Sequence, residues 1–320
     1  MKAVVLKSTC KADDLKVYEI DMPKIKDDWV LVKIIGFGIN RSEVILRDYE
    51  ADENYINLPI IPGIECVGEV INPSNTIFKK GDKVCSFMGG MGRNFNGSYA
   101  EYSLLPSKNI FKIKEEIFTK LTIEEIIAIP ETYFTAYGSI KTLNLSESDS
   151  LLIRGATSAT GLTAIQIASA IGCEIIATSR REDRFEKLKD SGADQCFVDD
   201  GNLASKIKCD KVLELIGPKT LKDSMSLLNE NGICCVTGIL GGKEILSDFD
   251  PIKSCHNRYL TSFFSNYPTQ EIIDDIFNFV ITHNINPAIG KVFNSLDDIG
   301  DAHKLMENNN TQGKIIFRLL

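Results

Sequence analysis

The sequence predicts an α/β protein in which a β-rich first part precedes a parallel, doubly wound sheet domain. Short strand-like runs separated by Gly and Pro turns fill residues 1–120, and helices alternate with strands from about residue 124. One strand–turn–helix–strand unit stands out at Leu151–Ser179. Alternating strands and helices predict a parallel sheet with right-handed crossovers, and 320 residues suffice for two domains.

The unit at Leu151–Ser179 has the length and pattern of a βαβ motif. Leu151-Leu152-Ile153 is an apolar run typical of a buried strand, and apolar residues then recur at helical spacing up to Gly172, a typical helix end. The run Ile175-Ile176-Ala177 completes the motif. The turn at 155–161 contains only small residues. Such a turn before a helix lets backbone N–H groups approach a pyrophosphate.

This turn matches the dinucleotide fingerprint G-x-G-x-x-G only at its third glycine. Ala156 and Ser158 stand at the other two glycine positions, and both are small. An alternative stays open, because small residues also permit close packing of a helix on a strand. The turn residues that we predict to bind a cofactor are Thr157, Ser158, Ala159, Thr160 and Gly161.

The amino-acid composition excludes some classes of binding partner. The formal net charge of −8 argues against nonspecific binding to nucleic acid or to an anionic membrane. No apolar run has the length of a membrane span, and the first residues lack the apolar region of a secretory signal. The nine cysteines are odd in number and never spaced C-x-x-C, which favours reduced thiols in the cytoplasm.

The first part of the chain contains mainly strands. We expect strands at 1–7, 15–20, 29–35, 61–72, 84–87, 98–105 and 109–113. Asn40 can cap a short helix after the Gly-Phe-Gly turn at 36–38. The glycine-rich stretch 88–97 precedes a strand, so we expect a flexible loop without a phosphate role.

The second part of the chain alternates between helices and strands. Pro130 must break or start a helix. Further helices are expected at 180–191, 218–229, 268–282 and 296–307, and strands at 195–198, 211–215, 232–237, 259–263, 289–293 and 314–319. These patterns predict one domain made of residues 1–123 and 268–320 and a second of residues 124–267.

Eight segments in this order resemble the medium-chain dehydrogenase/reductase superfamily, over nearly the whole chain. They are IPGIECVGEV, FKKGDKV, GSYAEY, IPETYFTAYGSI, LLIRGATSATGLTAIQIASAIG, SGADQCF, KVLELIG and GKIIFRL. The resemblance implies a GroES-like β-rich catalytic domain, closed by the C-terminal return of the chain, with a Rossmann domain inserted.

The chain departs from zinc-dependent members of that superfamily. The resemblance places a cysteine ligand where this chain has Asn40 and a histidine ligand where it has Ile64. No group of four cysteines follows Val84 to form a structural zinc site. The histidines all lie in the last quarter, at His256, His283 and His303. The chain therefore resembles the zinc-independent quinone oxidoreductase branch, with zeta-crystallin-like and enoyl-reductase-like members, and we expect no metal.

The resemblance also implies catalytic residues. It places Asn40 beside the nicotinamide and the substrate carbonyl and Thr135 near the nicotinamide amide. Tyr133 is a candidate donor to a substrate oxygen. The alternatives are a helix cap for Asn40, a surface hydroxyl for Thr135 and a packed helical tyrosine for Tyr133. A tyrosine common in this branch is replaced by Ile45, which leaves the proton donor unidentified.

The end of the second strand of the βαβ motif indicates which cofactor binds. NAD-binding sheets carry an acid near that strand end to hold the ribose 2′-hydroxyl. Here Ser179-Arg180-Arg181 follow, and hydroxyl and guanidinium groups suit a 2′-phosphate. Arg184 has the spacing of the family's basic 2′-phosphate residue, although it also fits a solvated helix face. Gly238 follows a strand end, where ligands bind in open sheets, although glycine there is also an ordinary turn. The further cofactor-binding residues are Ser179, Arg180, Arg184, Gly238, Ile239 and Phe263.

We therefore expect an NADPH-dependent, zinc-independent reductase that transfers hydride to quinones or α,β-unsaturated carbonyl compounds. Its partners would be a small-molecule substrate and a second copy of the chain, as a homodimer, without nucleic acid or membrane. A conjugated acceptor needs no metal, because the protein supplies placement and hydrogen bonds to the developing oxyanion. The alternatives are an enoyl-thioester reductase, which would need a wide or basic entrance, and a low-turnover NADPH-binding redox sensor or structural protein.

Overall fold

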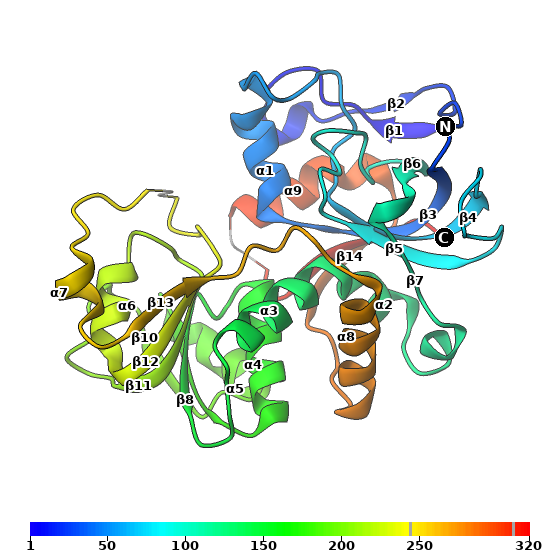
Figure 1. Cartoon of the computed structure of the whole chain (residues 1–320). Coiled ribbons are helices and arrows are strands. Elements are labelled where there is room, and N and C mark those ends of the chain that lie inside the picture. The colour runs from blue at the N-terminus through cyan, green and yellow to red at the C-terminus, as the bar shows by residue number, and fades with distance from the viewer. Residues whose placement is uncertain (243–244, 309–310) are drawn as a thin grey trace. The chain divides into compact units, whose positions relative to one another are not determined.

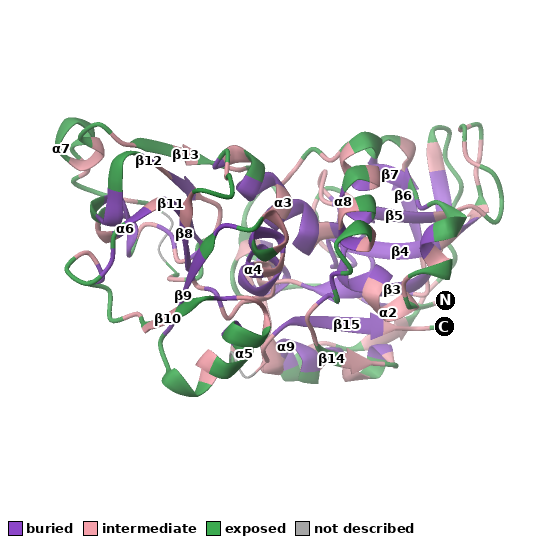
Figure 2. Ribbon diagram, turned by 90° about the horizontal axis from the view of Figure 1, so that it is seen from below, coloured by how far each residue is buried: buried purple, intermediate pink, exposed green. Residues whose placement is uncertain are grey.

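A computed structural model describes residues 1–242, 245–308 and 311–320 of the chain. The chain divides into two compact units. The split unit comprises Met1–Glu131 and Asn266–Leu320, and the continuous unit comprises Thr132–Ser265. Figures 1 and 2 together label their helices and strands. Among the described residues no helix is both long and apolar enough to cross a bilayer.

The split unit is built on a seven-stranded sheet with the order β14-β15-β3-β4-β5-β7, in which β6 pairs with β3. Its strands are β3 (Trp29–Ile39), β4 (Glu65–Asn72), β5 (Lys83–Phe87), β6 (Tyr102–Pro106), β7 (Ile110–Lys112), β14 (Ile289–Phe293) and β15 (Lys314–Arg318). Two more strands, β1 (Lys2–Val4) and β2 (Val17–Glu19), form a separate antiparallel pair. The C-terminal strand β15 runs antiparallel to β3, with Ile316 opposite Gly38.

Aromatic stacking anchors β15 in this sheet. The ring of Phe317 stacks on Phe37 of β3, with centroids 4.8 Å apart, and Phe37 stacks on Tyr99 at 4.9 Å. Figure 2 shows β3, β4 and β15 as mainly buried strands. The hydroxyl group of Tyr99 lies 3.1 Å from Nε2 of His303. Burial and the nearby Arg47 lower the pKa of His303 to about 3, so this histidine is a neutral core residue.

Helices flank this sheet. They are α1 (Arg41–Asp48), α2 (Ile123–Ala128), α8 (Gln270–Thr282) and α9 (Ile299–Glu307), with short 3₁₀ turns at Ala12–Asp14, Glu50–Asp52, Ser107–Asn109, Glu115–Thr119 and Leu296–Asp298. As expected, Pro130 begins a helix, α3 (Pro130–Thr142). Pro fits the first helical position because its missing N–H has no acceptor there in any case.

The continuous unit is a six-stranded parallel sheet in the order β10-β9-β8-β11-β12-β13. Its strands are β8 (Ser150–Arg154), β9 (Glu174–Ser179), β10 (Gln195–Val198), β11 (Cys209–Glu214), β12 (Leu228–Val236) and β13 (Tyr259–Ser262). Its helices are α4 (Ala159–Ile171), α5 (Phe185–Asp190), α6 (Leu221–Leu227) and α7 (Pro251–Cys255), with a 3₁₀ turn at Glu182–Arg184. Figure 1 places α4 and α6 on opposite faces of the sheet, the doubly wound arrangement.

A buried arginine ties three elements of the continuous unit together. Arg154 at the end of β8 is fully buried, and its guanidinium pairs with Asp199 at 2.7 Å and Asp223 at 2.8 Å. It also donates to the hydroxyl of Ser224 in α6 at 3.0 Å. A charge without access to water requires such partners, so Arg154 fixes the positions of the β8 and β10 ends relative to α6.

Two expected helices begin later than the sequence pattern indicated. The helix expected from residue 180 starts with the 3₁₀ turn and continues as α5, because the Ser179 hydroxyl accepts the N–H of Arg181 in a turn. The helix expected from residue 218 is α6 and ends at Leu227. The carboxylate of Glu214 accepts the N–H groups of Ile216 and Gly217, and this loop delays the start of the helix.

Candidate active site

The small-residue turn joins β8 to α4 as expected. Ser158 is the N-cap of α4, and its hydroxyl accepts the N–H of Gly161 at 3.0 Å and donates to the carbonyl of Gly155 at 2.9 Å. A Cβ atom at Gly161 would lie 2.6 Å from the backbone of Ala156. The glycine therefore serves close helix–strand packing, the alternative that the sequence left open.

The same turn retains the features of an anion site. The first N–H groups of a helix have no acceptor inside it, and in α4 they belong to Ala159 and Thr160, which are half-buried. Thr157 is half-buried as well. The 13-residue helix adds its dipole at this end. Packing and phosphate binding are thus compatible here, although the Ser158 hydroxyl already has partners within the turn.

The end of β9 carries the groups expected for a 2′-phosphate. Ser179 is buried, Arg180 is exposed, and the side chain of Arg184 is only 16% exposed. The N–H of Asp199 donates to the Ser179 carbonyl at 2.8 Å, so an acid lies beside this strand end. Asp183, in the turn that follows, pairs with Arg181 and lies 4.0 Å from Arg184. The carboxylate of Asp199 is bound to Arg154, at 2.7 and 2.8 Å. That ion pair occupies the carboxylate that would otherwise suit a ribose hydroxyl.

Tyr133 and Thr135 both lie in α3 and are buried. The Tyr133 hydroxyl donates to Oε1 of Gln166 at 3.1 Å. The group considered as a donor to substrate is therefore bound to the protein, which agrees with the packed-tyrosine alternative. Thr135 is buried rather than a surface hydroxyl, and its carbonyl accepts the hydroxyl of Ser139.

Three other predicted residues lie near the end of β12. Ser139 joins α3 to this end, because its hydroxyl lies 2.8 Å from that of Thr237, the neighbour of Gly238. A Cβ atom at Gly238 would collide with the backbone of Leu215, so the ends of β11 and β12 approach closely here. Ile239 is 37% exposed. The ring of Phe263, after β13, packs edge-on against Phe134 of α3 at 5.4 Å.

Asn40 belongs to the split unit and is the N-cap of α1. Its Oδ1 accepts a hydrogen bond from Nζ of Lys314 at 2.6 Å, and its Nδ2 donates to Oε1 of Glu65 at 2.9 Å. Nδ2 also donates to Oε1 of Glu43 at 3.4 Å. Lys314 and Glu65 form an ion pair at 2.5 Å, with side chains 3% and 0% exposed. The side-chain amide is thus held by a buried charged network.

Two more carboxylates complete this network. Glu43 is fully buried and accepts the N–H groups of Asn40 at 2.8 Å and Ile64 at 3.1 Å. Burial raises the pKa of Glu43 to about 7, aided by the charge of Glu65 and opposed by the Ile64 N–H and Lys314. Glu131 lies further away, with its carboxylate 3.9 Å from Nζ of Lys314.

Glu43, Glu65 and Lys314 were not predicted from the sequence as site residues. A signal was present, because Glu65 starts the apolar run ECVGEV and Lys314 starts the run KIIF. Charged residues are rarely buried without a partner, so two opposite charges in buried strands predict an ion pair. The sequence does not show that these two strands lie on either side of β3.

No zinc site is formed by these residues. Within residues 1–242, 245–308 and 311–320, no three His, Cys, Asp or Glu side chains are grouped to hold a metal. The positions that would supply a thiolate and an imidazole hold Asn40 and Ile64, whose side chains are poor zinc ligands. The residues present therefore do not fit this metal.

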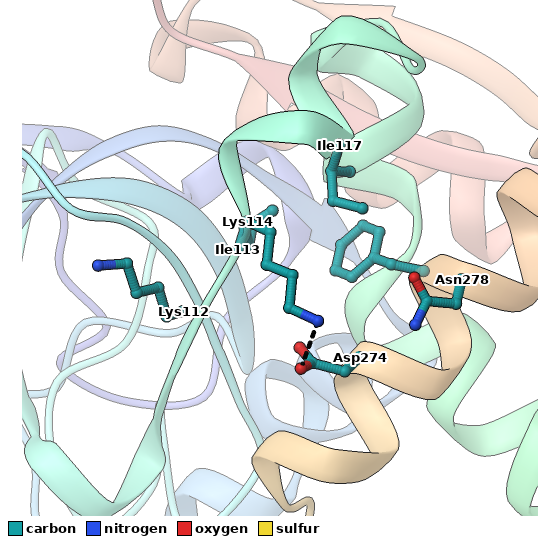
Figure 3. Close-up of a pocket in the computed structure, with 7 residues that line it drawn as sticks. Lys112, Ile113, Lys114, Ile117, Asp274 and Asn278 are labelled. Atoms are coloured by element: carbon teal, nitrogen blue, oxygen red, sulfur yellow. Dashed lines mark ion pairs between the residues drawn. The ribbon is translucent and has the colours of Figure 1, made fainter.

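Two hollows on the split unit contain none of the predicted site residues. One, with a volume of about 460 Å³, lies beside the loop 88–97 and is lined by residues that include Trp29, Arg93 and Tyr102. The other is shown in Figure 3, where Lys114 of the chain before α2 forms an ion pair with Asp274 of α8 at 2.9 Å. It has no interior space for a water molecule.

The pKa of Glu43 predicts a pH dependence of stability. The folded state holds this proton up to about pH 7, whereas the unfolded state releases it near 4.5, so the contribution is complete below pH 4.5 and is lost as the pH rises through 7. The difference is on the order of 3 kcal/mol. In urea unfolding at pH 5 and pH 8, Glu43→Gln should lose less stability over this interval than the wild type.

The half-exposed Glu69 offers a matched control, because Lys83 holds its pKa below the ordinary value, outside this interval. Glu69→Gln should follow the wild-type pH dependence. Equal pH dependence in the wild type and Glu43→Gln would show that Glu43 does not titrate as described.

Comparison with known proteins agrees with this architecture. Residues 26–115 match the family described as alcohol dehydrogenase GroES-like domain, and residues 159–280 match that described as zinc-binding dehydrogenase. The zinc-binding dehydrogenase match does not include Asn40 or Ile64. The predicted combination of a GroES-like domain with a Rossmann domain is therefore confirmed.

Individual relatives cover almost the whole chain. The quinone oxidoreductase of Homo sapiens is 29% identical over 314 residues, which are 94% of this chain and 92% of the human one. The solved quinone oxidoreductase of Coxiella burnetii has a TM-score of 0.86 at 23% identity, with 100% and 99% of the chains covered. The yhdH oxidoreductase of Salmonella enterica, in complex with NADP, has a TM-score of 0.84 at 19% identity, with both chains fully covered. The chain therefore belongs to the medium-chain dehydrogenase/reductase superfamily, in its quinone oxidoreductase branch.

Proposed function

We propose that this oxidoreductase uses NADPH and reduces quinones or α,β-unsaturated carbonyl compounds without zinc. The proposal rests on the residues at the end of β9. Ser179 is the last residue of β9, Arg180 follows it, and Arg184 ends the next 3₁₀ turn. The nearby carboxylate of Asp199 is bound by Arg154. A 2′-phosphate is favoured by hydroxyl and guanidinium donors. The NADP complex of the similar Salmonella enterica protein supports the same cofactor.

Each unit contributes a different part of the proposed reaction. Bound NADPH supplies the hydride. In the continuous unit, the N–H groups at the start of α4 would hold the pyrophosphate, and Thr135 would hold the nicotinamide amide. In the split unit, Asn40 binds the substrate oxygen, on which negative charge develops as hydride is transferred. Conjugation in the acceptor spreads this charge, so the positive charge of a metal is not required.

Turnover provides the direct test of this function. NADPH oxidation should be observed with quinones or enones, and it should be unchanged after dialysis against a chelator. Enoyl-thioesters should be tested in the same assay, because a preference for them would identify the protein as an enoyl-thioester reductase instead. Activity lost on chelation and restored by zinc would contradict the proposal.

The choice of cofactor depends on two arginines. Arg180→Ala and Arg184→Ala should each weaken NADPH binding about tenfold or more, because a hydrogen bond to a charged group contributes roughly 1.5–3 kcal/mol. NADH binding should change little, since NADH lacks the 2′-phosphate. Fluorescence titration with both cofactors measures this.

Arg181 supplies the control. It is exposed, and both oxygens of the Asp183 carboxylate bind its guanidinium, whereas Arg184 lies 4.0 Å from Asp183. Arg181→Ala should therefore leave NADPH affinity near the wild-type value. Equal affinity of the wild type for NADH and NADPH would refute the assignment.

We also propose that two copies associate through β13. This strand is at the edge of the parallel sheet, and Tyr259 and Leu260 on it are 59% and 38% exposed. Pairing with a symmetry-related β13 would satisfy the open edge. Light scattering should give about twice the chain mass of 35.5 kDa, and Leu260→Pro should give the monomer. Tyr267→Lys, an exposed aromatic outside the strand, should remain dimeric. A monomeric wild type would contradict this proposal.

The cysteines support a reducing compartment. All nine lie within the described residues and are free thiols. Free thiols persist in the cytoplasm, where disulfides are rare, and we propose this location.

A further inference from the structure

The two ends of the Asn40 amide have opposite partners. An asparagine amide is nearly symmetric in shape but not in polarity, because one end donates and the other accepts. Lys314, whose ammonium only donates, lies 2.6 Å from Oδ1. Glu65, whose carboxylate only accepts when ionised, lies 2.9 Å from Nδ2. A flipped amide would face the ammonium with its NH₂ group and the carboxylate with its oxygen, so the pair selects one orientation.

The pair is itself held rigidly. Both side chains are buried, which excludes water as a substitute partner. Gly38 of β3 provides the space, because a Cβ atom there would collide with Cε of Lys314 and the carboxylate of Glu65. The stacking of Phe317 on Phe37 fixes β15, which carries Lys314.

One N–H bond of the amide is held less firmly than the other. Nδ2 donates to Glu65 at 2.9 Å but to Glu43 at 3.4 Å, at the long limit of a hydrogen bond. The same Glu43 oxygen already accepts the N–H of Ile64 at 3.1 Å. The N–H directed at Glu43 therefore costs least to transfer to another acceptor.

We propose that Lys314, with Glu65 as its counter-ion, is a positioning residue that orients the Asn40 amide so that this N–H group meets the substrate oxygen. The inference rests on the proposed function, in which Asn40 binds that oxygen. A flipped amide would present its own carbonyl oxygen to the developing negative charge. Loss of Lys314 therefore lowers the rate of hydride transfer without affecting the cofactor-binding turn.

The kinetic test uses a double variant. Lys314→Met alone would leave the buried Glu65 charge without a partner and can unfold the protein, so Glu65→Gln is combined with it. The double variant should fold, keep its KM for NADPH within about twofold, and lose about tenfold or more in kcat, since one oxyanion donor contributes roughly 10²–10³ in kcat. A wild-type kcat in the double variant would overturn the proposal.

Lys83 and Glu69 provide a matched control. They form a half-exposed ion pair on β5 and β4 of the same sheet, at 2.6 Å. The double variant Lys83→Met/Glu69→Gln removes the same two types of charged group from a different place in the sheet. It should leave kcat unchanged. An equal loss of kcat in this control would attribute the effect to the sheet and refute the positioning role.

A second measurement does not depend on turnover. With ¹⁵N-asparagine, the side-chain signals of Asn40 are identified by their loss in Asn40→Ser. Their protons should exchange slowly with solvent in the wild type and at least about tenfold faster in the double variant Glu65→Gln/Lys314→Met, with the exposed Asn94 as the unprotected reference. Unchanged protection overturns the proposal even if kcat falls. Changed protection in a protein that reduces no substrate would instead count against the proposed function.

Discussion

The buried ion pair between Lys314 and Glu65 is the constraint on which the candidate active site depends. Neither charge is stable away from water without the other. Together they connect the first residue of β15 to the first residue of β4 across β3, between parts of the chain 249 residues apart (314 − 65). The return of the C-terminal segment to the N-terminal sheet thus supplies the cation of a network that ends on Asn40.

Buried ion pairs also connect strand ends in the continuous unit. Arg154 stands directly before the small-residue turn, and its ion pairs with Asp199 and Asp223 connect the end of β8 to the end of β10 and to α6. The pair with Asp199 occupies that carboxylate beside the end of β9. In the proposed function, this leaves Ser179 and the arginines to bind a 2′-phosphate. In both units, buried ion pairs define which polar groups remain available to a ligand.

Local sequence signals predicted the elements well where short-range chemistry determines them. Gly172 ends α4 in the left-handed conformation, with φ +93°, which glycine adopts at little cost. Pro130 starts α3, and Asn40 precedes α1. The signals were less accurate where a side chain distant from the turn controls it. The start of α6 is delayed by Glu214, whose carboxylate binds the backbone of the preceding loop.

The sequence alone was sufficient to predict the alternation of strands and helices, the small-residue turn and the basic residues after β9, because each pattern involves residues that are close together in the chain. It also identified Asn40 as a candidate, through resemblance. The surroundings of Asn40 depend on the folded chain, because Glu43 comes from the same helix, Glu65 from a neighbouring strand and Lys314 from the last strand. The orientation of an amide depends on the donors and acceptors at its two ends, and strand pairing over long sequence separations brings these together.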